Sequence, residues 1–245
     1  MQLKLIEIDE LNSTNDYARE LIENSGAENG MIISAAFQSH GKGQSKAVWE
    51  SEKGKNILMS IILKPEFLMA EKYFFISMIA SLGIADCLHT AFGIENVKIK
   101  WPNDIYINAR KVAGILIQND LNQHGISSSI IGIGLNVNQM SFSNSLPNPI
   151  SMQHVLKKEI DLTFVREKLV EFILHKYHLL IEGRFEEIKA NYESQLYKYN
   201  LSAEFSSQQK CFDGIIRGVD EYGKLVVETH AELKSFDMKE IAYIL

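Results

Sequence analysis

Two short segments of the chain carry charged residues beside small or rigid ones. The first is the polar loop Gly41-Lys42-Gly43-Gln44-Ser45-Lys46. Paired glycines let backbone N–H groups approach an anion that side chains would block. The loop lacks the GxxxxGK[ST] pattern of a phosphate loop, and a dinucleotide fingerprint needs a third glycine where Lys46 stands. By itself the loop therefore fits an anion-binding lid and a solvated surface turn equally well.

The second segment holds two polar side chains on a turn between apolar stretches. Asn103 and Asp104 follow Pro102, which stiffens the turn. A carboxylate at this point can coordinate Mg²⁺ or accept a proton from an amine. Further on, Lys111 precedes the apolar residues 112–116 and can hold a carboxylate or a phosphoryl group as a point charge. A plain turn and a hairpin lysine remain the alternative.

A third segment leaves one face of an expected strand bare. Gly132 and Gly134 share a face because strand side chains alternate with a period of two, and Asn136 continues that face as a polar group. A bare face indicates the close approach of a ligand or of another backbone. Packing against a long helix would also explain the glycines.

Elements of both types must position these segments. Periodicity predicts strands near 3–8, 31–37, 56–63, 97–101, 105–107, 112–119 and 128–136, and helices near 13–24, 71–92, 150–157, 163–182 and 185–197. The last part of the chain changes to short strands at 211–219, 224–228 and 241–244. We therefore expect two domains, residues 1–198 and residues 199–245.

Composition narrows the class of protein. The 245 residues have a net charge of −6, and only five of the 25 cationic residues are arginine, so a basic nucleic-acid-binding face is not indicated. No apolar run reaches the roughly 18 residues of a membrane span, and the N-terminus has no leader pattern. Cys87 and Cys211 lack metal-ligand spacing. These features favour a cytoplasmic protein with neither nucleic acid nor membrane as a partner.

Taken in order, the motifs resemble those of biotin protein ligases. The resemblance covers nearly the whole chain and rests on Ser13-Thr14-Asn15, Gln38, the glycine loop with Trp49, KWPND at 100–104, KVAGIL at 111–116 and GIGLNVN at 132–138. It implies an α+β fold: a catalytic domain like that of class II synthetases and lipoate ligases, with a mixed, largely antiparallel sheet and flanking helices, then a small SH3-like β-barrel. The chain begins at the catalytic domain, so it resembles the monofunctional type without a DNA-binding domain.

The resemblance also implies a reaction and a set of site residues. The family joins biotin to ATP, with Mg²⁺, to give biotinyl-5′-AMP and pyrophosphate, and then passes the biotinyl group to a lysine of a biotin carboxyl carrier domain. Its members are monomers or homodimers. The implied catalytic residues are Lys111, Asp104 and Lys42. The implied biotin-binding residues are Ser13, Thr14, Asn15, Gln38, Gly41, Lys42, Gly43, Gln44, Lys111 and Gly114, and the implied ATP-binding residues are Trp49, Asn103, Lys111 and Asn136.

Each catalytic residue has an implied role. Lys111 would bridge the biotin carboxylate and the α-phosphate of ATP. Lys42 and the amides of Gly41 and Gly43 would cover the same anions. Asp104 would orient or deprotonate the incoming lysine amine, whose ordinary pKa near 10.4 leaves it mostly protonated at neutral pH. Asn103 and Asn136 would face the nucleotide and Mg²⁺, for which no ligand set is implied.

The loop departs from the family pattern, which is commonly GRG(R/Q)RG. Here Lys42, Gln44 and Ser45 stand at up to three arginine positions, and Lys46 lies one step away. Lysine neutralises charge but lacks the planar fork that clamps a phosphate. The departure predicts a weaker hold on biotinyl-AMP. The glycines and the polar run of the loop predict a mobile lid that becomes ordered on ligand binding.

Two other functions compete with biotin ligation. A lipoate or octanoate ligase would share the catalytic architecture and the lysine. A non-catalytic binder of biotin or biotinyl-AMP would explain the altered loop. Adenylation with biotin, adenylation with lipoate, and ligand binding without adenylation are the outcomes that separate the three functions.

Overall fold

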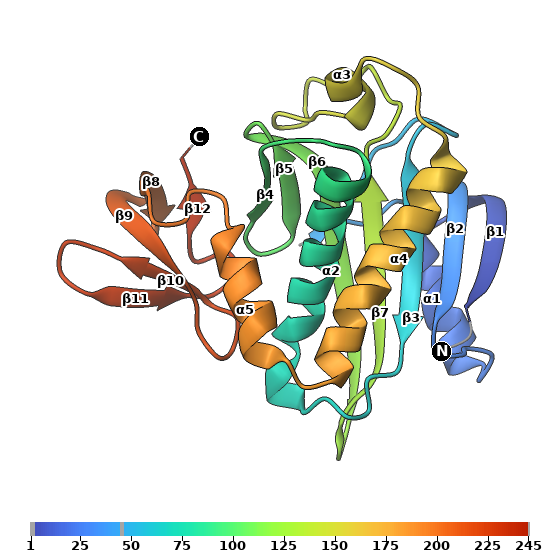
Figure 1. Ribbon diagram of the computed structural model, residues 1–245, viewed down its shortest axis with the longest axis horizontal. Helices are drawn as coiled ribbons and strands as arrows, with labels where there is room; N and C mark the ends of the chain where they lie inside the picture. The colour runs from blue at the N-terminus through green and yellow to red at the C-terminus, as the bar shows by residue number, and fades with distance from the viewer. Residues whose placement is uncertain (1–2, 45–46, 245) are drawn as a thin grey trace.

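The computed structural model describes residues 3–44 and 47–244. A seven-stranded sheet has the order β1-β2-β3-β7-β6-β5-β4, and a smaller sheet lies beside it (Figure 1). Only β1 and β2 pair in parallel, while the other neighbours are antiparallel. The strands are β1 (Lys4–Leu11), β2 (Met31–Gln38), β3 (Ile57–Leu63), β4 (Val97–Lys100), β5 (Asp104–Ile107), β6 (Arg110–Asn122) and β7 (Gly125–Leu135). The expected α+β class with a mixed, largely antiparallel sheet is confirmed.

Helices cover both faces of the large sheet (Figure 1). The helical elements are α1 (Thr14–Glu23), η2 (Ala70–Lys72), α2 (Phe74–Asp86), η3 (Cys87–Ala91), α3 (Met152–Leu156), α4 (Leu162–Ile181) and α5 (Phe185–Ser194). In place of the single helix expected at 71–92, a 3₁₀ turn, an α-helix and a π-helical turn follow one another. Helices α2 and α4 lie on one face, and α1 lies on the other.

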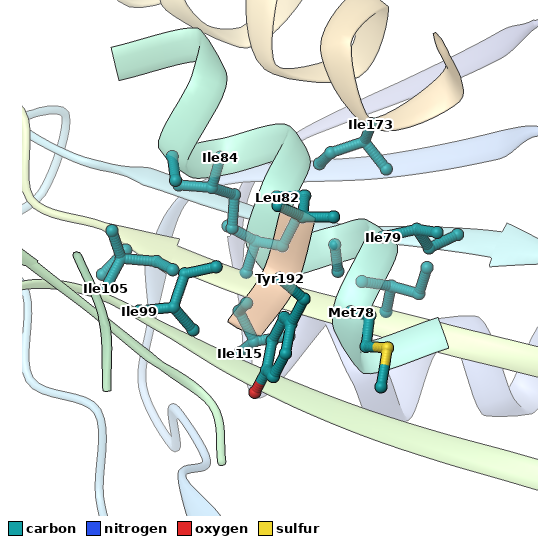
Figure 2. Close-up of a cluster of buried hydrophobic side chains, with 14 of the residues drawn as sticks. Met78, Ile79, Leu82, Ile84, Ile99, Ile105, Ile115, Ile173 and Tyr192 are labelled. Carbon is teal, nitrogen blue, oxygen red and sulfur yellow. The ribbon is translucent and has the colours of Figure 1, made fainter. Parts of the chain in front are cut away.

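The main core lies between the sheet and α2. This helix is apolar on nearly all sides because the sheet, α4 and α5 surround it. Figure 2 shows side chains of this core, among them Leu82 of α2 and Ile115 of β6. Gly83 lets α2 and α4 approach, because a Cβ there would lie 2.7 Å from Ile173 Cα. The stretch Ala70–Ala91 is long and apolar enough for a membrane span, but 67% of its most apolar window is buried inside the protein. Its apolar character is therefore explained by the core.

A smaller cluster fastens α1 to the opposite face. Ala18 packs there with Ile33, Ile62 and Ile130 from three adjacent strands. The residues on this face of β6 and β7 include glycines, so α1 covers only part of it and leaves space beside its N-terminus.

The C-terminal sheet has five antiparallel strands in the order β11-β10-β9-β8-β12. They are β8 (Ser202–Ser207), β9 (Lys210–Val219), β10 (Leu225–Glu228), β11 (Leu233–Phe236) and β12 (Ala242–Tyr243). Strands β8 and β11 were not expected. Strand β8 has serine at three of its six positions, and β11 exposes three of its four residues. The domain boundary at 198/199 stays a prediction.

The KWPND segment joins the two sheets. Trp101 Nε1 donates to the carbonyl of Gly223 over 2.9 Å. Gly223 has a φ of +81° and lies against the Phe74 ring. A Cβ built on Gly223 would lie 2.1 Å from Phe74 Cγ, so only glycine fits at this position. Glu193 of α5 accepts a hydrogen bond from the Val219 N–H over 3.0 Å. The turn of β9 and β10 is thereby held close to the segment that carries Asp104.

Candidate functional site

A pocket of about 260 Å³ opens on the α1 face of the large sheet. The segments that meet there are the N-terminus of α1, the end of β2, the loop after β2, the start of β5, and β6 and β7. Its lining residues are Ser13, Thr14, Asn15, Gln38, Lys42, Gly43, Gln44, Ala47, Val48, Trp49, Asn103, Asp104, Lys111, Gly114, Ile115, Leu116, Gly132, Ile133 and Gly134. Tertiary structure thus brings all three predicted motifs to one cavity.

Glycines form the floor of this pocket. A Cβ at Gly132 would lie 2.1 Å from Asn15 Oδ1, and a Cβ at Gly134 would lie 2.3 Å from Trp49 Cε2. Gly114, the register partner of Gly134, also faces the Trp49 indole, because a Cβ there would lie 3.0 Å from Trp49 Cζ3. The alternative that a long helix packs on these glycines is wrong, because α2 lies on the other face of the sheet.

The N-terminus of α1 supplies one end of the pocket. Ser13 is the N-cap residue, yet its side chain makes no capping hydrogen bond, although the residue is 3% exposed. The backbone N–H of Thr14 donates to Gln38 Oε1 over 2.7 Å. This contact turns the Gln38 side chain so that its NH₂ group is left for other partners. Hydroxyl and amide groups therefore gather at this end.

Ser60 is a residue that sequence reasoning missed. Its hydroxyl oxygen lies 2.7 Å from Thr14 Oγ1 and 2.7 Å from Asn15 Oδ1. The Asn15 amide nitrogen in turn donates to the Leu116 carbonyl over 3.2 Å. The available signal was one serine within the otherwise apolar strand β3. Ser60 is fully buried and supports the pocket from behind.

Lys111 and Asp104 form an ion pair at the other end. Lys111 Nζ lies 2.6 Å from Asp104 Oδ1, and both side chains are more than two-thirds buried. The Lys111 ammonium also lies 5.6 Å from the centre of a Trp49 ring, within cation–π range. Two strands supply this pair, because Asp104 begins β5 and Lys111 lies near the start of β6.

A second, apolar pocket of about 190 Å³ adjoins the first. Its lining residues are Ala47, Val48, Trp49, Glu50, Lys111, Asn136, Phe142, Leu146, Pro147 and Pro149. The residues that line both pockets, and so form the wall between them, are Ala47, Val48, Trp49 and Lys111. The buried indole N–H of Trp49 has no hydrogen-bond partner within residues 3–44 and 47–244.

The two asparagines expected near the nucleotide are tied to the main chain. Asn136 lines the apolar pocket, and its Nδ2 donates to the Ile150 carbonyl over 3.1 Å. Asn103 lines the first pocket only, and its Nδ2 donates to the Ile115 carbonyl over 2.7 Å. The apolar pocket therefore groups Asn136 with Trp49 and Lys111, whereas Asn103 lines the first pocket with the same two residues.

The glycine loop folds back on itself as a short hairpin. Lys42 Nζ pairs with Asp16 Oδ1 of α1 over 2.7 Å. The Gly43 N–H, expected to cover an anion, donates instead to the Ala47 carbonyl over 2.7 Å. Gly41 does not line the pocket; a Cβ there would lie 2.5 Å from the Trp49 carbonyl, so it allows the two arms of the hairpin to approach. Ser45 and Lys46 lie outside the described residues.

Polar contacts also anchor α1 beside the pocket. Arg19 pairs with Asp120 of β6, and Ser128 Oγ donates to the same carboxylate over 2.6 Å. Burial acts to raise the pKa of Asp120, but the hydrogen bonds from Arg19 and Ser128 outweigh it and lower that pKa below 3.8. The ionised carboxylate therefore fastens the helix that carries Thr14 and Asn15.

Comparisons with known proteins follow the same motifs. Residues 7–138 match the model of the biotin/lipoate A/B protein ligase family. The bifunctional ligase/repressor BirA of Bacillus spizizenii is 32% identical over 240 residues, which are 97% of this chain and 73% of that protein. BirA of Escherichia coli is 27% identical over 236 residues, covering 95% of this chain and 71% of that protein.

Solved structures show the same fold. The biotin protein ligase from Aquifex aeolicus in complex with biotin and ATP superposes with a TM-score of 0.82 at 23% identity, covering 98% of this chain and 97% of that one. A biotin protein ligase-like protein of unknown function from Silicibacter superposes with a TM-score of 0.73 at 14% identity, over 96% and 94% of the two chains.

Proposed function

The chain belongs to the biotin/lipoate A/B protein ligase family, and we propose that its two adjoining pockets bind biotin and ATP on either side of Lys111. It is a biotin–protein ligase, an enzyme that activates biotin as biotinyl-5′-AMP and transfers the biotinyl group to a protein. The observation that carries the proposal is the position of the Lys111 ammonium, in the wall that the two pockets share.

Biotin occupies the larger, polar pocket in this proposal. Its ureido ring meets the hydroxyls of Ser13 and Thr14 and the NH₂ group of Gln38, and its carboxylate reaches Lys111. The glycine floor leaves room for the bicyclic ring to lie flat against the backbone of β6 and β7. A urea needs a donor and an acceptor close together, and hydroxyl and carboxamide groups supply both.

The adenine ring of ATP occupies the apolar pocket. Pro147, Pro149 and Trp49 all line that cavity, and flat apolar walls suit an aromatic base. With adenine in the apolar pocket and biotin in the polar pocket, the α-phosphate lies beside Lys111, which lines both.

The first half-reaction joins two anions. A biotin carboxylate oxygen attacks the α-phosphorus, an O–P bond forms, and pyrophosphate leaves with the electrons of the broken bond. The Lys111 ammonium offsets the repulsion between carboxylate and phosphate in a site shielded from water. Asp104 holds this ammonium in place before the substrates arrive.

The second half-reaction uses the other member of the ion pair. The amine of the acceptor lysine attacks the acyl carbon of biotinyl-AMP, a C–N bond forms, and AMP leaves. Asp104, no longer occupied by Lys111 once anions bind it, accepts the proton that the amine loses. The acceptor in this proposal is a biotin carboxyl carrier domain.

Magnesium enters this proposal with ATP. Within residues 3–44 and 47–244 no three His, Cys, Asp or Glu side chains cluster as a metal site. Asp104 is the one carboxylate among the described lining residues of the larger pocket. A single carboxylate fits Mg²⁺, which keeps several waters and takes further ligands from phosphates, and the ion supplies charge neutralisation at the triphosphate.

An adenylation assay on Lys111 variants tests the proposal. We expect the wild type to form biotinyl-AMP from biotin and labelled ATP, and to form none from lipoate. Lys111→Met removes the ammonium but keeps the length of the side chain, and should lower adenylation by at least about 100-fold. The matched control is Lys53→Met, because Lys53 forms a 2.6 Å ion pair with Asp9 away from both pockets.

The results separate the competing functions. Adenylation with lipoate but not biotin would overturn the choice of substrate. Binding of biotin without any adenylate would indicate a binder. A Lys111→Met variant that adenylates biotin at the rate of Lys53→Met would contradict the role given to Lys111.

A further inference from the structure

One wall of the apolar pocket belongs to a segment outside the helices and strands, residues 140–149, which we call the flap. Hydrogen bonds fix both of its ends. At the start, Gln139 Nε2 donates to the Ser141 carbonyl over 2.8 Å. At the end, the Lys111 N–H donates to the Asn148 carbonyl over 2.9 Å. The middle of the flap therefore depends on its side chains for its position.

Phe142 is the aromatic side chain of the flap, and it makes contacts in two directions. Most flap residues are exposed, whereas Phe142 is partly buried and lines the apolar pocket. Its ring is also stacked on the ring of His154, with centroids 6.0 Å apart and planes inclined by 29°. This geometry is within the range of favourable aromatic pairs. His154 is thus in contact with a pocket wall without lining either pocket itself.

Helix α3 holds His154 in place. Ser151 is the N-cap of this helix and is fully buried. Its Oγ accepts a hydrogen bond from the His154 N–H over 3.3 Å and lies 2.7 Å from His154 Nδ1. The helix is joined to the main chain after β7, because the Met152 N–H donates to the Asn136 carbonyl over 3.0 Å. The imidazole is therefore a fixed surface on which Phe142 rests.

We propose that His154 is a positioning residue, which does not touch the nucleotide but holds Phe142 against the adenine ring and thereby sets the affinity of the enzyme for ATP. The inference rests on the proposed function, in which adenine occupies the apolar pocket. A ring that is already held at the pocket wall does not have to be ordered when the base binds, so less binding free energy is lost. Without the imidazole, Phe142 would be joined only to an exposed flap.

The charge of the imidazole affects this stack. Burial lowers the pKa of His154 below its ordinary 6.5, and the neighbouring cations Arg110 and Lys157 lower it further. A hydrogen bond with the Met140 main chain acts in the opposite direction but is the smallest of these effects. Arg110 belongs to β6 and also donates to the Pro149 carbonyl of the flap over 2.5 Å. Protonation therefore favours the unstacked ring: the stack is intact above pH 6.5 and weakens as the pH falls through the lower value.

The test measures KM for ATP, KM for biotin and kcat for adenylation in the full-length chain. At about pH 8, His154→Ala should raise KM for ATP about fivefold, the value of one aromatic contact. The values of kcat and of KM for biotin should change less than about twofold, because the lost interaction concerns the binding of ATP alone. His154→Phe keeps a flat ring at this position and should restore most of the lost affinity.

The pH dependence supplies a second readout, which a merely structural role would not change. A terminal phosphate also titrates near pH 6, so the quantity to follow is the ratio of KM for ATP in the wild type to that in His154→Phe at the same pH. Because phenylalanine cannot be protonated, this ratio should rise as the pH falls from about 7.5 to about 5.5.

A double-mutant cycle shows whether His154 acts through Phe142. Phe142→Ala should itself raise KM for ATP, and His154→Ala should add less than about 1.5-fold in that background. The matched control is His178→Ala. Its imidazole lies on the last turn of α4, 3.3 Å from a Glu182 carboxylate oxygen and on the other face of the sheet from the polar pocket. This variant should keep the wild-type KM for ATP at every pH.

The outcomes separate this inference from the proposed function. A wild type that forms no adenylate from biotin would contradict the proposed function itself. An active Phe142→Ala with unchanged KM for ATP would take adenine out of the apolar pocket and overturn the inference. A His154→Ala protein with the wild-type KM, or one whose loss is equally large in the Phe142→Ala background, would overturn the role of His154. A ratio that does not vary with pH would overturn the role of its charge.

Discussion

The glycine floor makes the position of Trp49 sensitive to a single methyl group. A Cβ at Gly134 would lie 2.3 Å from the Trp49 indole, about 1.1 Å inside the 3.4 Å limit of ordinary contact. Because Trp49 belongs to a loop and is partly exposed, we expect the indole, and not the sheet, to move in Gly134→Ala. The free energy of unfolding should then fall by only about 1 kcal/mol, the low end for overpacked sites.

Activity should fall much more than stability. The indole forms the wall between the two pockets, and a 1 Å misplacement in an active site can cost about 100-fold in rate. Gly114→Ala gives a graded comparison, because its Cβ would lie 3.0 Å from the same indole and needs a shift of about 0.4 Å. If the logarithm of the rate follows the shift, that variant should lose about fivefold in kcat/KM for adenylation.

Steady-state pyrophosphate release measures kcat/KM for adenylation in both variants, and thermal unfolding measures their stability. A double-mutant cycle then identifies the cause of the loss. In a Trp49→Ala background the clash is absent, so Gly134→Ala should add less than about threefold to the loss already caused by Trp49→Ala. Equal losses from Gly134→Ala in both backgrounds, or a larger loss from Gly114→Ala, would refute the explanation by displacement of Trp49.

Three further predictions concern the surroundings of the pocket. Asp16→Asn removes the partner of Lys42, so the freed ammonium should slow the release of biotinyl-AMP about two- to fivefold; release measured by rapid filtration that is as fast as in the wild type would contradict this. The lowered pKa of the Asp120 carboxyl means that its stabilising contribution is present above pH 3.8 and is lost as the pH falls through the lower folded value. Asp120→Asn should therefore cost about 1 kcal/mol in urea unfolding at pH 7 and progressively less as the pH falls below 3.8, and a difference independent of pH would count against the ion pair. Gly223→Ala places a methyl 2.1 Å from the Phe74 ring at a φ of +81°, so it should lower the free energy of unfolding by about 2 kcal/mol or more, and an unchanged melting temperature would contradict the docking described for the small sheet.

Local patterns made most of the elements of this fold predictable. Strands β2 and β3 are nearly continuous apolar runs, and β6 and β7 contain apolar stretches at 112–117 and 130–135, because helices cover the sheet. Pro65 marks the end of β3, and asparagine or glycine follows the apolar stretches of β6 and β7. Strands β8 and β11 were missed because their exposed polar residues form no such pattern. The change to a π-helical turn after Asp86 was missed as well, because a segment of only five residues is too short to show a hydrophobic period different from that of the α-helix before it.

By itself, the sequence determined the chemistry that is present: a loop lysine, an Asn-Asp pair after proline, Lys111 before an apolar strand, and a strand face bared by glycines. Only the tertiary structure decided which of these groups meet. It paired Lys111 with Asp104, paired Lys42 with Asp16, and placed Ser60 behind Thr14. Lys42 with Asp16 and Ser60 with Thr14 join elements that are distant in the chain, so these contacts depend on which face of the sheet α1 covers. Lys111 and Asp104 lie on the consecutive strands β5 and β6, and their contact depends on the register of that pair, which shifts between Ile105 and Tyr106. Neither the covered face nor the register is encoded in the local pattern that identifies each residue.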